Sequence, residues 1–567
     1  MIVGIDLGTT NSLISYFGGA DGAPSKAQLI PNALGEILTP SCVSLTDDGS
    51  LLVGRAAREH LVTRASHSAA AFKRAMGTDR EFVLGNKRFR AEELSALVLR
   101  SLLADAKAHF DELPTEAVIS VPAYFNDAQR KATRAAGQLA GIKVERLINE
   151  PTAAALAYGL ETAASDKTFL IFDLGGGTFD VSILEMFEGV MQVHASAGDN
   201  FLGGEDFTRV LIDSALAEHA LRWEALTPGE RGQLVSRFER GKLALGRNQQ
   251  VKVVFEVAGK SAEFSFDEAR FEELAKPLVQ RLRVPIERAL RDAKMDPAKL
   301  SEVVLVGGSA RLTMVPRLIS RMFGRLALRH LNPDEVIGLG AGVAAGLKAR
   351  DAALEEVVLT DVSPYTMGLE TSKADERGNI HSGFFAPIIE RNSTVPVSRS
   401  ETFGPVRDHQ KELELVIYQG ESPHVSHNVR LGMISIALEA RKALENQVEV
   451  RFTYDVNGLL QVEATELRTK RRHELIIQQN PGLLSEQDIR SRLAQLDKLK
   501  MHPREAQENT MVIARAERIF AEYLLARPQI TEWLALFAAA LGSQDLARIE
   551  QARREFNAAL DHVEQFA

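Results

Sequence analysis

The sequence is poor in cysteine, the residue that holds many small domains together. Its 567 residues contain one cysteine, Cys42. A single cysteine excludes an internal disulfide and any site in which several cysteines hold a metal, and it fits a reducing compartment. We therefore expect a cytoplasmic protein whose stability comes from ordinary hydrophobic cores.

The chain also lacks long apolar runs and an excess of basic residues. The first apolar segment is interrupted at Asp6 and has no basic leader, so we expect no signal peptide. No run approaches the roughly 20 residues of a membrane-spanning helix. The formal net charge of −9 disfavours nucleic acid and anionic membranes as partners. The length and the 45% hydrophobic content instead favour several globular domains.

A glycine-rich turn between two apolar strands is the most informative stretch. Residues 169–181 read Phe-Leu-Ile-Phe-Asp-Leu-Gly-Gly-Gly-Thr-Phe-Asp-Val. Consecutive glycines can adopt positive φ and let backbone N–H groups converge on one phosphate. Asp173 and Asp180 flank the turn and suit a divalent cation or an attacking water. An ordinary glycine hairpin would give the same local pattern.

The same pattern occurs again near the N-terminus. A short strand ends in Asp6-Leu-Gly, a Thr9-Thr10-Asn11 turn follows, and a second strand returns. Chance repetition of the motif in this order is improbable. The duplication predicts two similar lobes that close on one nucleotide from opposite sides.

Two charged residues of the first lobe are further candidates. Glu150 follows an apolar strand and precedes a proline, which favours a helix start, so it would face the cleft. Its alternative role is to stabilise the positive end of that helix. Lys73 would suit a phosphate, although a lone lysine on a helix is more often solvated. A further helix is expected from Asp127 to Ala140.

The pattern of apolar and polar residues changes after about residue 355. Residues 354–362 are acidic, then apolar, then acidic, which is typical of a linker with an apolar middle; the alternative is a last edge strand. From 363 to 480 apolar residues alternate, and Asn457-Gly458 between two alternating runs predicts a β-hairpin. From Ser485 onward the pattern is helical.

At this point several motifs together resemble the 70-kDa heat-shock chaperones. The match is collinear over essentially the whole chain, and the sequence is more similar to the HscC-type specialised bacterial subgroup than to the housekeeping DnaK. The motifs that carry the resemblance are Asp6-Leu-Gly-Thr-Thr-Asn-Ser12, Val121-Pro-Ala-Tyr-Phe-Asn-Asp127, Asn149-Glu-Pro-Thr-Ala-Ala154, Phe172-Asp-Leu-Gly-Gly-Gly-Thr-Phe-Asp180, Leu202-Gly-Gly-Glu-Asp206 and Val306-Gly-Gly-Ser309.

The resemblance implies a multidomain fold. It comprises an α/β actin-like two-lobed ATPase domain, an interdomain linker, a β-sandwich that binds extended peptides, and a short α-helical lid. The implied bounds are 1–355 for the ATPase domain (lobes of about 1–165 and 166–355), 356–362 for the linker, 363–480 for the sandwich and 481–567 for the lid.

The resemblance also implies an ATP-dependent chaperone that hydrolyses ATP to ADP and phosphate. Its cofactors would be ATP or ADP with Mg²⁺, and K⁺ is a second candidate cation. The catalytic set implied is Lys73, Glu150, Asp173 and Thr178, and the carboxylates implied for the metal are Asp6, Asp173 and Asp180. The nucleotide-binding set implied is Thr9, Thr10, Asn11, Gly175, Gly176, Gly177, Glu239, Lys242, Gly307, Gly308, Ser309, Arg311 and Asp334.

Two further sets follow from the same resemblance. The residues that would relay the nucleotide state or dock a J-domain are Pro122, Arg130, Arg146, Val357, Val358, Leu359 and Asp361. Those that would line the peptide groove are Leu369, Thr371, Phe403, Val406, Leu413, Leu415 and Leu459. The loop between Ser372 and Gly383 is longer and more charged than is usual in the family, so the groove's selectivity is open.

The partners expected are unfolded or extended client chains and a J-domain co-chaperone, and the protein is expected to be a monomer. The segment Val254–Phe266 lacks the long loop that engages the GrpE exchange factor, so no factor of that type is expected. Two rival functions share the duplicated hairpin. A sugar kinase would need a sugar cleft with a catalytic aspartate, an actin-like filament protein would need polymerisation surfaces, and neither needs the 200-residue C-terminal appendage.

Overall fold

The structure is a computed structural model of the 567-residue chain. It describes residues 1–19, 25–32, 35–45, 51–159, 167–187, 190–246, 249–257, 260–328, 331–351, 354, 358–374, 379–456, 458, 460–476, 512, 516, 526–543 and 546–566.

A six-stranded mixed sheet, called the first sheet below, contains the N-terminal aspartate hairpin. Its order is β11-β10-β1-β2-β3, with β4 paired to β2. Strand β1 is parallel to β10 and antiparallel to β2. The strands are Ile2–Leu7 (β1), Asn11–Gly18 (β2), Lys26–Ile30 (β3), Thr39–Pro40 (β4), Glu116–Val121 (β10) and Lys143–Asn149 (β11).

The second sheet repeats this arrangement. Its order is β17-β12-β13-β14-β18-β21. Strand β12 is parallel to β17 and antiparallel to β13, as β1 is to its two neighbours. The predicted duplication of the hairpin is therefore confirmed. The strands are Lys167–Leu174 (β12), Phe179–Phe187 (β13), Val190–Asp199 (β14), Glu302–Val306 (β17), Val358–Val362 (β18) and Thr394–Val395 (β21).

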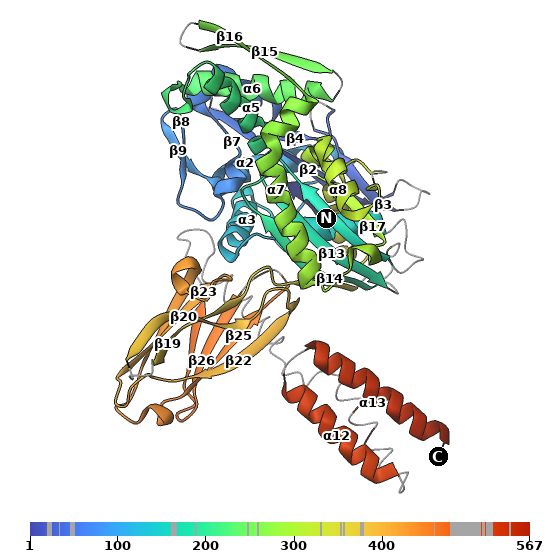
Figure 1. Ribbon diagram of the computed structural model, residues 1–567, viewed down its shortest axis with the longest axis vertical. Helices are drawn as coiled ribbons and strands as arrows, with labels where there is room; N and C mark the ends of the chain where they lie inside the picture. The colour runs from blue at the N-terminus through green and yellow to red at the C-terminus, as the bar shows by residue number, and fades with distance from the viewer. Residues whose placement is uncertain are drawn as a thin grey trace.

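Helices and small hairpins surround the two sheets (Figure 1). The helices are Arg55–Thr63 (α1), Ala91–Phe110 (α2), Asp127–Ala140 (α3), Glu150–Gly159 (α4), Gly204–Glu218 (α5), Pro228–Leu245 (α6), Glu268–Asp292 (α7), Met314–Phe323 (α8) and Val336–Ala349 (α9), with short 3-10 turns at Phe72–Ala75 (η2) and Gly308–Arg311 (η5). The minor strands are Cys42–Leu45 (β5), Leu51–Val53 (β6), Ser68–Ala70 (β7), Glu81–Leu84 (β8), Lys87–Arg90 (β9), Gln250–Val257 (β15) and Lys260–Asp267 (β16).

Local sequence sets the bounds of α3. The Asn126 side chain accepts a hydrogen bond from the Gln129 N–H (2.9 Å), and the Gln129 side chain accepts one from the Asn126 N–H (3.0 Å). This reciprocal cap satisfies two N–H groups that a helix start leaves without partners. Gly141 follows the last turn with φ of 85°, a conformation that glycine adopts without strain. The predicted helix Asp127–Ala140 is confirmed.

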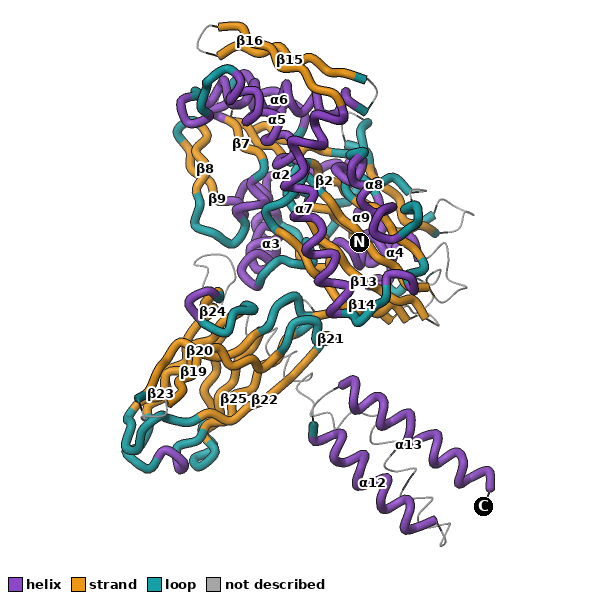
Figure 2. Tube along the Cα trace, viewed as in Figure 1, coloured by secondary structure: helices purple, strands orange, loops and turns teal. Residues whose placement is uncertain are grey.

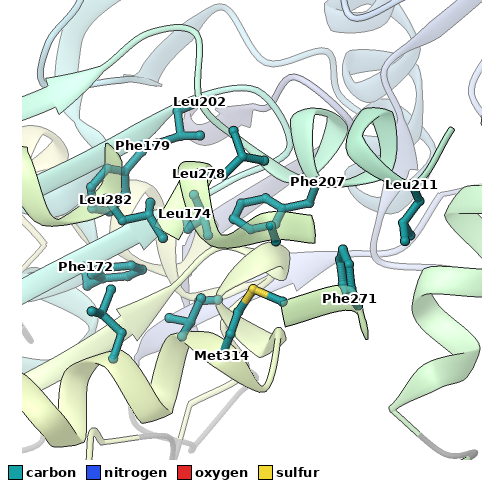
Figure 3. Close-up of a cluster of buried hydrophobic side chains, with 14 of the residues drawn as sticks. Phe172, Leu174, Phe179, Leu202, Phe207, Leu211, Phe271, Leu278, Leu282 and Met314 are labelled. Atoms are coloured by element: carbon teal, nitrogen blue, oxygen red, sulfur yellow. The ribbon is translucent and has the colours of Figure 1, made fainter. Parts of the chain in front are cut away.

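Aromatic residues on either side of the glycine turn anchor the second hairpin. Phe172 and Phe179 are fully buried, and their ring centroids lie 4.7 Å apart. They share a core with Phe207 of α5 and Phe271 of α7, shown in Figure 3. Because these side chains are packed on all sides, the aspartates beside them in the strands have little freedom to move.

Two four-stranded sheets, called the paired C-terminal sheets below, are formed by strands that follow β18 in sequence (Figure 2). Their orders are β20-β19-β23-β24 and β22-β25-β26-β27. Apolar residues of both sheets form one buried core. The hairpin predicted at Asn457-Gly458 is confirmed by the β25–β26 pairing, although Asn457 lies outside the described residues. The strands are Met367–Ala374 (β19), Ile380–Ile389 (β20), Val397–Phe403 (β22), Glu412–Gln419 (β23), Val429–Ala437 (β24), Val448–Tyr454 (β25), Leu460–Glu466 (β26) and Arg472–Ile476 (β27).

The C-terminal part of the chain contains two long helices in its described residues, Arg527–Gly542 (α12) and Leu546–Phe566 (α13). They share a small core that includes Phe537, Ile549 and Phe556, so their apolar faces pack within the helical pair. The helix start expected at Ser485 lies outside the described residues. In the portions of the chain that are described, no helix has the length and apolar character needed to cross a membrane.

Candidate active site

The turns of the two duplicated hairpins face one another. A Cβ atom added at Gly176 would overlap the Thr10 hydroxyl, and one added at Gly177 would lie 2.7 Å from a Thr9 methyl group. The positive φ that was predicted for the glycines of this turn is wrong, because none of Gly175, Gly176 and Gly177 adopts it. At Gly176 and Gly177 the close approach of the opposite turn, rather than backbone conformation, excludes side chains.

Three aspartates lie beneath these turns. Asp6 is the penultimate residue of β1, and Asp173 and Asp180 are directly paired across the β12–β13 hairpin. All three are buried. Ser120 of β10 donates a hydrogen bond to Asp6 Oδ1 (2.6 Å). The Asp173 and Asp180 Oδ2 atoms accept no hydrogen bond, so each has an oxygen free for a cation or its water.

The electrostatics of the aspartates follow from burial and from each other. Burial, with nearby Glu150 as the second cause, raises the pKa of Asp6 to about 6 and that of Asp180 to about 8. The same two causes raise the pKa of Asp173 well above its usual value. Carboxyl groups are therefore concentrated here beyond what the nearby positive charge compensates, and a bound cation would favour their charged forms.

Lys73 and Glu150 form the one buried ion pair of this cluster in the described residues. The Lys73 ammonium lies 2.7 Å from Glu150 Oε1, and both side chains are almost fully buried. The alternative of a solvated Lys73 is therefore wrong. Glu150 is the first residue of α4, so the alternative role at a helix start also applies to it. The pair places one positive charge beside three aspartates.

The residues fit a magnesium ion held through water. Among the described residues, no group of three His, Cys, Asp or Glu side chains is close enough to ligate a metal directly. Mg²⁺ commonly keeps several of its waters and is bound by one or two carboxylates plus substrate phosphates. The free Oδ2 atoms of Asp173 and Asp180 and the raised pKa values match that mode.

A second polar cluster lies at the N-terminus of α5. The Lys242 ammonium donates to the Gly204 carbonyl and the Thr208 hydroxyl, both at 2.8 Å, and pairs with Glu239 at 2.7 Å. Thr208 also donates to Glu239. Next to this cluster, a Cβ added at Gly204 would meet the Ser309 hydroxyl. The structure thus brings Glu239, Lys242 and Ser309 together, as the resemblance implied.

The turn after β17 completes this side of the cleft. Gly307 has φ of 81° and its N–H donates to the Pro333 carbonyl (2.9 Å). Arg311 donates to Asp334 Oδ2 (2.6 Å), and Gly308 is close to the same aspartate, so Gly308, Arg311 and Asp334 form one group.

Arg130 is held by the turn that Pro122 opens. Its guanidinium donates to the carbonyls of Ala123 and Phe125, each at 3.1 Å, and to Asn149 Oδ1 at 2.7 Å. Asn149 immediately precedes Glu150. Arg130 therefore ties the turn after β10 to the strand that ends at the Lys73–Glu150 pair.

The apolar segment that was expected to be a linker includes a strand of the second sheet, β18. Strand β18 pairs in parallel with β14, with Val358 opposite Val190 and Leu359 opposite Met191. The segment is therefore a strand, as the alternative prediction had it, but it lies between β14 and β21 rather than at the edge of the sheet, and Leu359 packs against the core beside it. Val357 lies outside the described residues.

Asp361 at the end of β18 contacts the first half of the chain. Asp361 Oδ2 accepts a hydrogen bond from Thr152 of α4 (3.0 Å). Burial lowers the pKa of Arg146, and the attraction of Asp361 opposes that shift. The structure therefore brings Arg146 and Asp361 together. Farther along, Arg391 forms an ion pair with Asp292 of α7 (2.8 Å).

Most of the residues expected in the peptide groove lie in the core of the paired C-terminal sheets. Leu369, Leu413 and Leu415 are buried there, and Phe403 packs against that core. Thr371 donates to the Phe384 carbonyl (3.4 Å) across β19–β20. Val406 instead lines an open hollow of about 440 Å³, whose other lining residues are Ile380, Arg407, Asp408, His409 and Gln410. Leu459 lies outside the described residues.

Sequence reasoning missed two residues of the site. Arg74 donates to the Gly177 carbonyl (3.0 Å) and pairs with Asp206 (2.5 Å), so it joins the two halves beside the glycine turn. Nothing in the local sequence distinguishes it from a solvated arginine. Ser120 did carry a signal, since it is a lone polar residue within the apolar run 117–121.

Comparison with known proteins identifies the family. A family model described as Hsp70 protein matches residues 2–84 and 80–564. The chain belongs to the Hsp70 family. A Chaperone protein DnaK from Thermotoga neapolitana is 38% identical over 530 residues, 91% of this chain and 86% of that protein. The same figures hold for the DnaK of Thermotoga maritima, and the DnaK of Thermosipho africanus is 37% identical over 529 residues.

Membership of the Hsp70 family decides between the three functions considered from the sequence. This protein is an ATP-dependent molecular chaperone and an ATPase, rather than a sugar kinase or a filament protein. Hsp70 proteins bind ATP or ADP with Mg²⁺, and DnaK-like chaperones bind unfolded clients and J-domain co-chaperones. The name DnaK does not distinguish an HscC-type subgroup, so that assignment stays a prediction.

Proposed function

We propose that residues 1–355 hydrolyse ATP and that residues 356–362 transmit the nucleotide state to a peptide-binding β-sandwich, residues 363–480. One observation supports this most directly. Strand β18 is hydrogen-bonded to β14, and β14 is paired with β13, which carries Asp180. The linker is thus two strands away from the carboxylates of the active site. The two lobes (1–165 and 166–355) and a helical lid (481–567) complete the proposed architecture.

The proposed roles follow from the geometry. The backbone of Gly175–Thr178 and the turn Thr9–Asn11 hold the phosphates, because these two turns face one another. Glu150 and Asp173 orient the attacking water, and Thr178 lies beside it. The Lys73 ammonium stabilises charge that develops on the γ-phosphoryl group. Positioning and electrostatic stabilisation are the main protein contributions to phosphoryl transfer.

The metal and the adenosine take the remaining residues. Bound Mg²⁺ would neutralise phosphate charge, and K⁺ is a second candidate at the same carboxylates. Asp6, Asp173 and Asp180 would hold the waters of Mg²⁺. The residues proposed to hold the adenosine are Glu239, Lys242, Gly307, Gly308, Ser309, Arg311 and Asp334.

The relay and the partners are further parts of the proposal. Pro122 and Arg130 sense the nucleotide through the strand that ends in Asn149, and Arg146 with Asp361 forms the J-domain docking surface. The peptide groove is built from Leu369, Thr371, Phe403, Val406, Leu413, Leu415 and Leu459. We also propose an HscC-type, cytoplasmic, monomeric chaperone that releases nucleotide without a GrpE-type factor.

A double substitution in the linker tests the coupling. Full burial of an apolar side chain contributes about 1.5 kcal/mol or more, and reversal of a two-state equilibrium takes about 5.5 kcal/mol. Changing Val358 and Leu359 together to Asp removes part of that energy and adds two charges that a docked strand would have to desolvate, so stimulation of ATP turnover by peptide should be abolished. The matched control changes Val429 and Met433, exposed on β24, to Asp. Stimulation that persists in the linker variant would contradict the proposal.

Two other experiments address the partners. ADP release should be changed less than twofold by a GrpE-type factor, and a large acceleration would contradict that part of the proposal. A Thr178→Ala variant, slowed in hydrolysis, should retain client chains long enough for their recovery and identification.

A further inference from the structure

Tyr124 lies between the active site and the paired C-terminal sheets. It belongs to the turn between β10 and α3, and its N–H donates to Asp180 Oδ1 (3.1 Å). Its ring hydroxyl accepts from Arg288 of α7 (3.0 Å). Gly198 of β14 makes this approach possible, since a Cβ there would lie 2.7 Å from Asp180 Oδ1 and 3.0 Å from the Tyr124 Cβ. Tyr124 is therefore fixed directly against a carboxylate of the site.

Tyr365 holds the same residue from the other side. Its hydroxyl donates to the Tyr124 carbonyl (2.7 Å), which also accepts from Asn200 (2.9 Å). Two donors use both lone pairs of that carbonyl. The rings of Tyr124 and Tyr365 are also in contact, with centroids 4.5 Å apart. The two peptide groups that flank the Tyr124 Cα are thus held, one by Asp180 and the other by Tyr365.

Tyr365 is in turn tied to the C-terminal sheets. It lies between β18 and β19, and its carbonyl accepts from the Ser363 hydroxyl (2.9 Å). The next residue, Thr366, donates its N–H to Glu421 (2.9 Å) and accepts from the Gly420 N–H (2.9 Å). A displacement of these sheets would carry Tyr365 with it, because the adjacent Thr366 is hydrogen-bonded to Gly420 and Glu421, which directly follow β23.

We propose that Tyr365 is a positioning residue of the ATPase site, acting on Asp180 through Tyr124. With the sheets seated as in this structure, the Tyr365 hydroxyl keeps the Tyr124 N–H directed at Asp180. When the sheets separate from the ATPase domain, that hydroxyl bonds to water and Tyr124 loses one of its restraints. The inference rests on the proposed function, because it assumes that the sheets change position with nucleotide state.

Coupling through one contact makes a reciprocal prediction. If the Tyr365 bond links the two sites, its loss must reduce the effect of ATP on peptide affinity and the effect of peptide on ATP affinity by the same factor. A residue that merely supports the fold would change the intrinsic affinities and leave this coupling factor unchanged. One neutral hydrogen bond is worth about fivefold in such an equilibrium.

The test uses the full-length chain with Tyr365→Phe, which keeps the ring and removes the hydroxyl. Kd is measured for a labelled extended apolar peptide with and without ATP and Mg²⁺, and for ATP with and without that peptide. A Thr178→Ala background slows hydrolysis in every sample. We expect both coupling factors to fall about fivefold, with the peptide Kd in the absence of nucleotide unchanged.

The control is Tyr418→Phe, which makes the same chemical change in β23, where the hydroxyl donates to Glu370 (3.3 Å) away from Tyr124. An unchanged coupling factor in Tyr365→Phe, or an equal loss in Tyr418→Phe, would overturn the inference. If the chain with Tyr365 intact shows no coupling, the proposed function itself fails, and the two failures are thereby distinguished.

Discussion

The two aspartate hairpins share a topology but contribute different chemistry. The first has threonine hydroxyls in its turn, a serine partner for Asp6, and the Lys73–Glu150 pair nearby. The second has a turn of bare glycine and two carboxylates with free oxygens. The difference has a steric cause, since two turns can meet this closely only if one of them lacks side chains. The first half therefore contributes the buried cation of this cluster, Lys73, and the second contributes two carboxylates with free oxygens.

The largest effect should come from removing the buried cation, Lys73. Lys73→Ala takes away the buried cation beside the aspartates and leaves Glu150 unpaired. We expect kcat for ATP hydrolysis to fall about 100- to 1000-fold, the range for loss of a group that stabilises transition-state charge. Single-turnover hydrolysis measures this.

Its control is Lys143→Ala, an exposed lysine paired with Glu116 and Glu145 on β10 and β11. That variant should keep its turnover within about twofold, as surface ion pairs contribute little. A Lys73→Ala variant with near-normal turnover would show that the two hairpins do not divide the work as described.

A methyl group on the bare turn should weaken nucleotide binding. Gly176→Ala places a Cβ against the Thr10 side chain, whereas a Cβ at Gly175 has no neighbour closer than 3.8 Å. Overpacking of this kind costs about 1–3 kcal/mol, so we expect ATP binding by Gly176→Ala to weaken about 5- to 150-fold. Titration of ATP into both variants gives the comparison. Equal affinities for the two variants would mean that the turns do not have to approach each other.

The carboxylates of the second hairpin should make cation binding depend on pH. Asp180, with a pKa raised to about 8, holds a proton at pH 7 when no cation is present. A cation favours the charged form, so binding must release that proton, and Mg²⁺ affinity should fall about tenfold per pH unit below pH 8 for one displaced proton. Calorimetry of Mg²⁺ with ADP at several pH values measures it.

Asp180→Asn is the control for the pH dependence, because it removes the carboxyl group whose pKa is raised to about 8. The dependence between pH 7 and 8 should flatten in this variant. A Mg²⁺ affinity that rises as the pH falls would contradict the assignment of these carboxylates.

The smallest effect concerns the ion pair between Arg74 and Asp206, which lies beside the glycine turn. Arg74→Gln removes the ion pair with Asp206 across the cleft, and the pair is partly exposed. Exposed and partly exposed pairs contribute up to about 1 kcal/mol, so ADP release should accelerate about twofold to fivefold. Stopped-flow release of a fluorescent ADP analogue measures this. A slower release would mean that Arg74 opposes closure.

The sequence predicted local elements well and distant partners poorly. The helix Asp127–Ala140, both aspartate hairpins and the hairpin around Gly458 depend on caps, glycines and alternation within a few residues. The groove stays a prediction, because the same alternating leucines that suit a groove also suit the core between two sheets. Leu369, Leu413 and Leu415 lie in that core.

The sequence by itself determined that this chain carries two aspartate-glycine hairpins and, through its family motifs, that it is an Hsp70 chaperone. Only the tertiary structure decided that Arg74 reaches Gly177, that Ser120 meets Asp6, and that Tyr365 holds Tyr124. The physical reason is separation along the chain: short-range patterns encode periodicity and capping, whereas these contacts depend on how strands order within the sheets and which faces then meet.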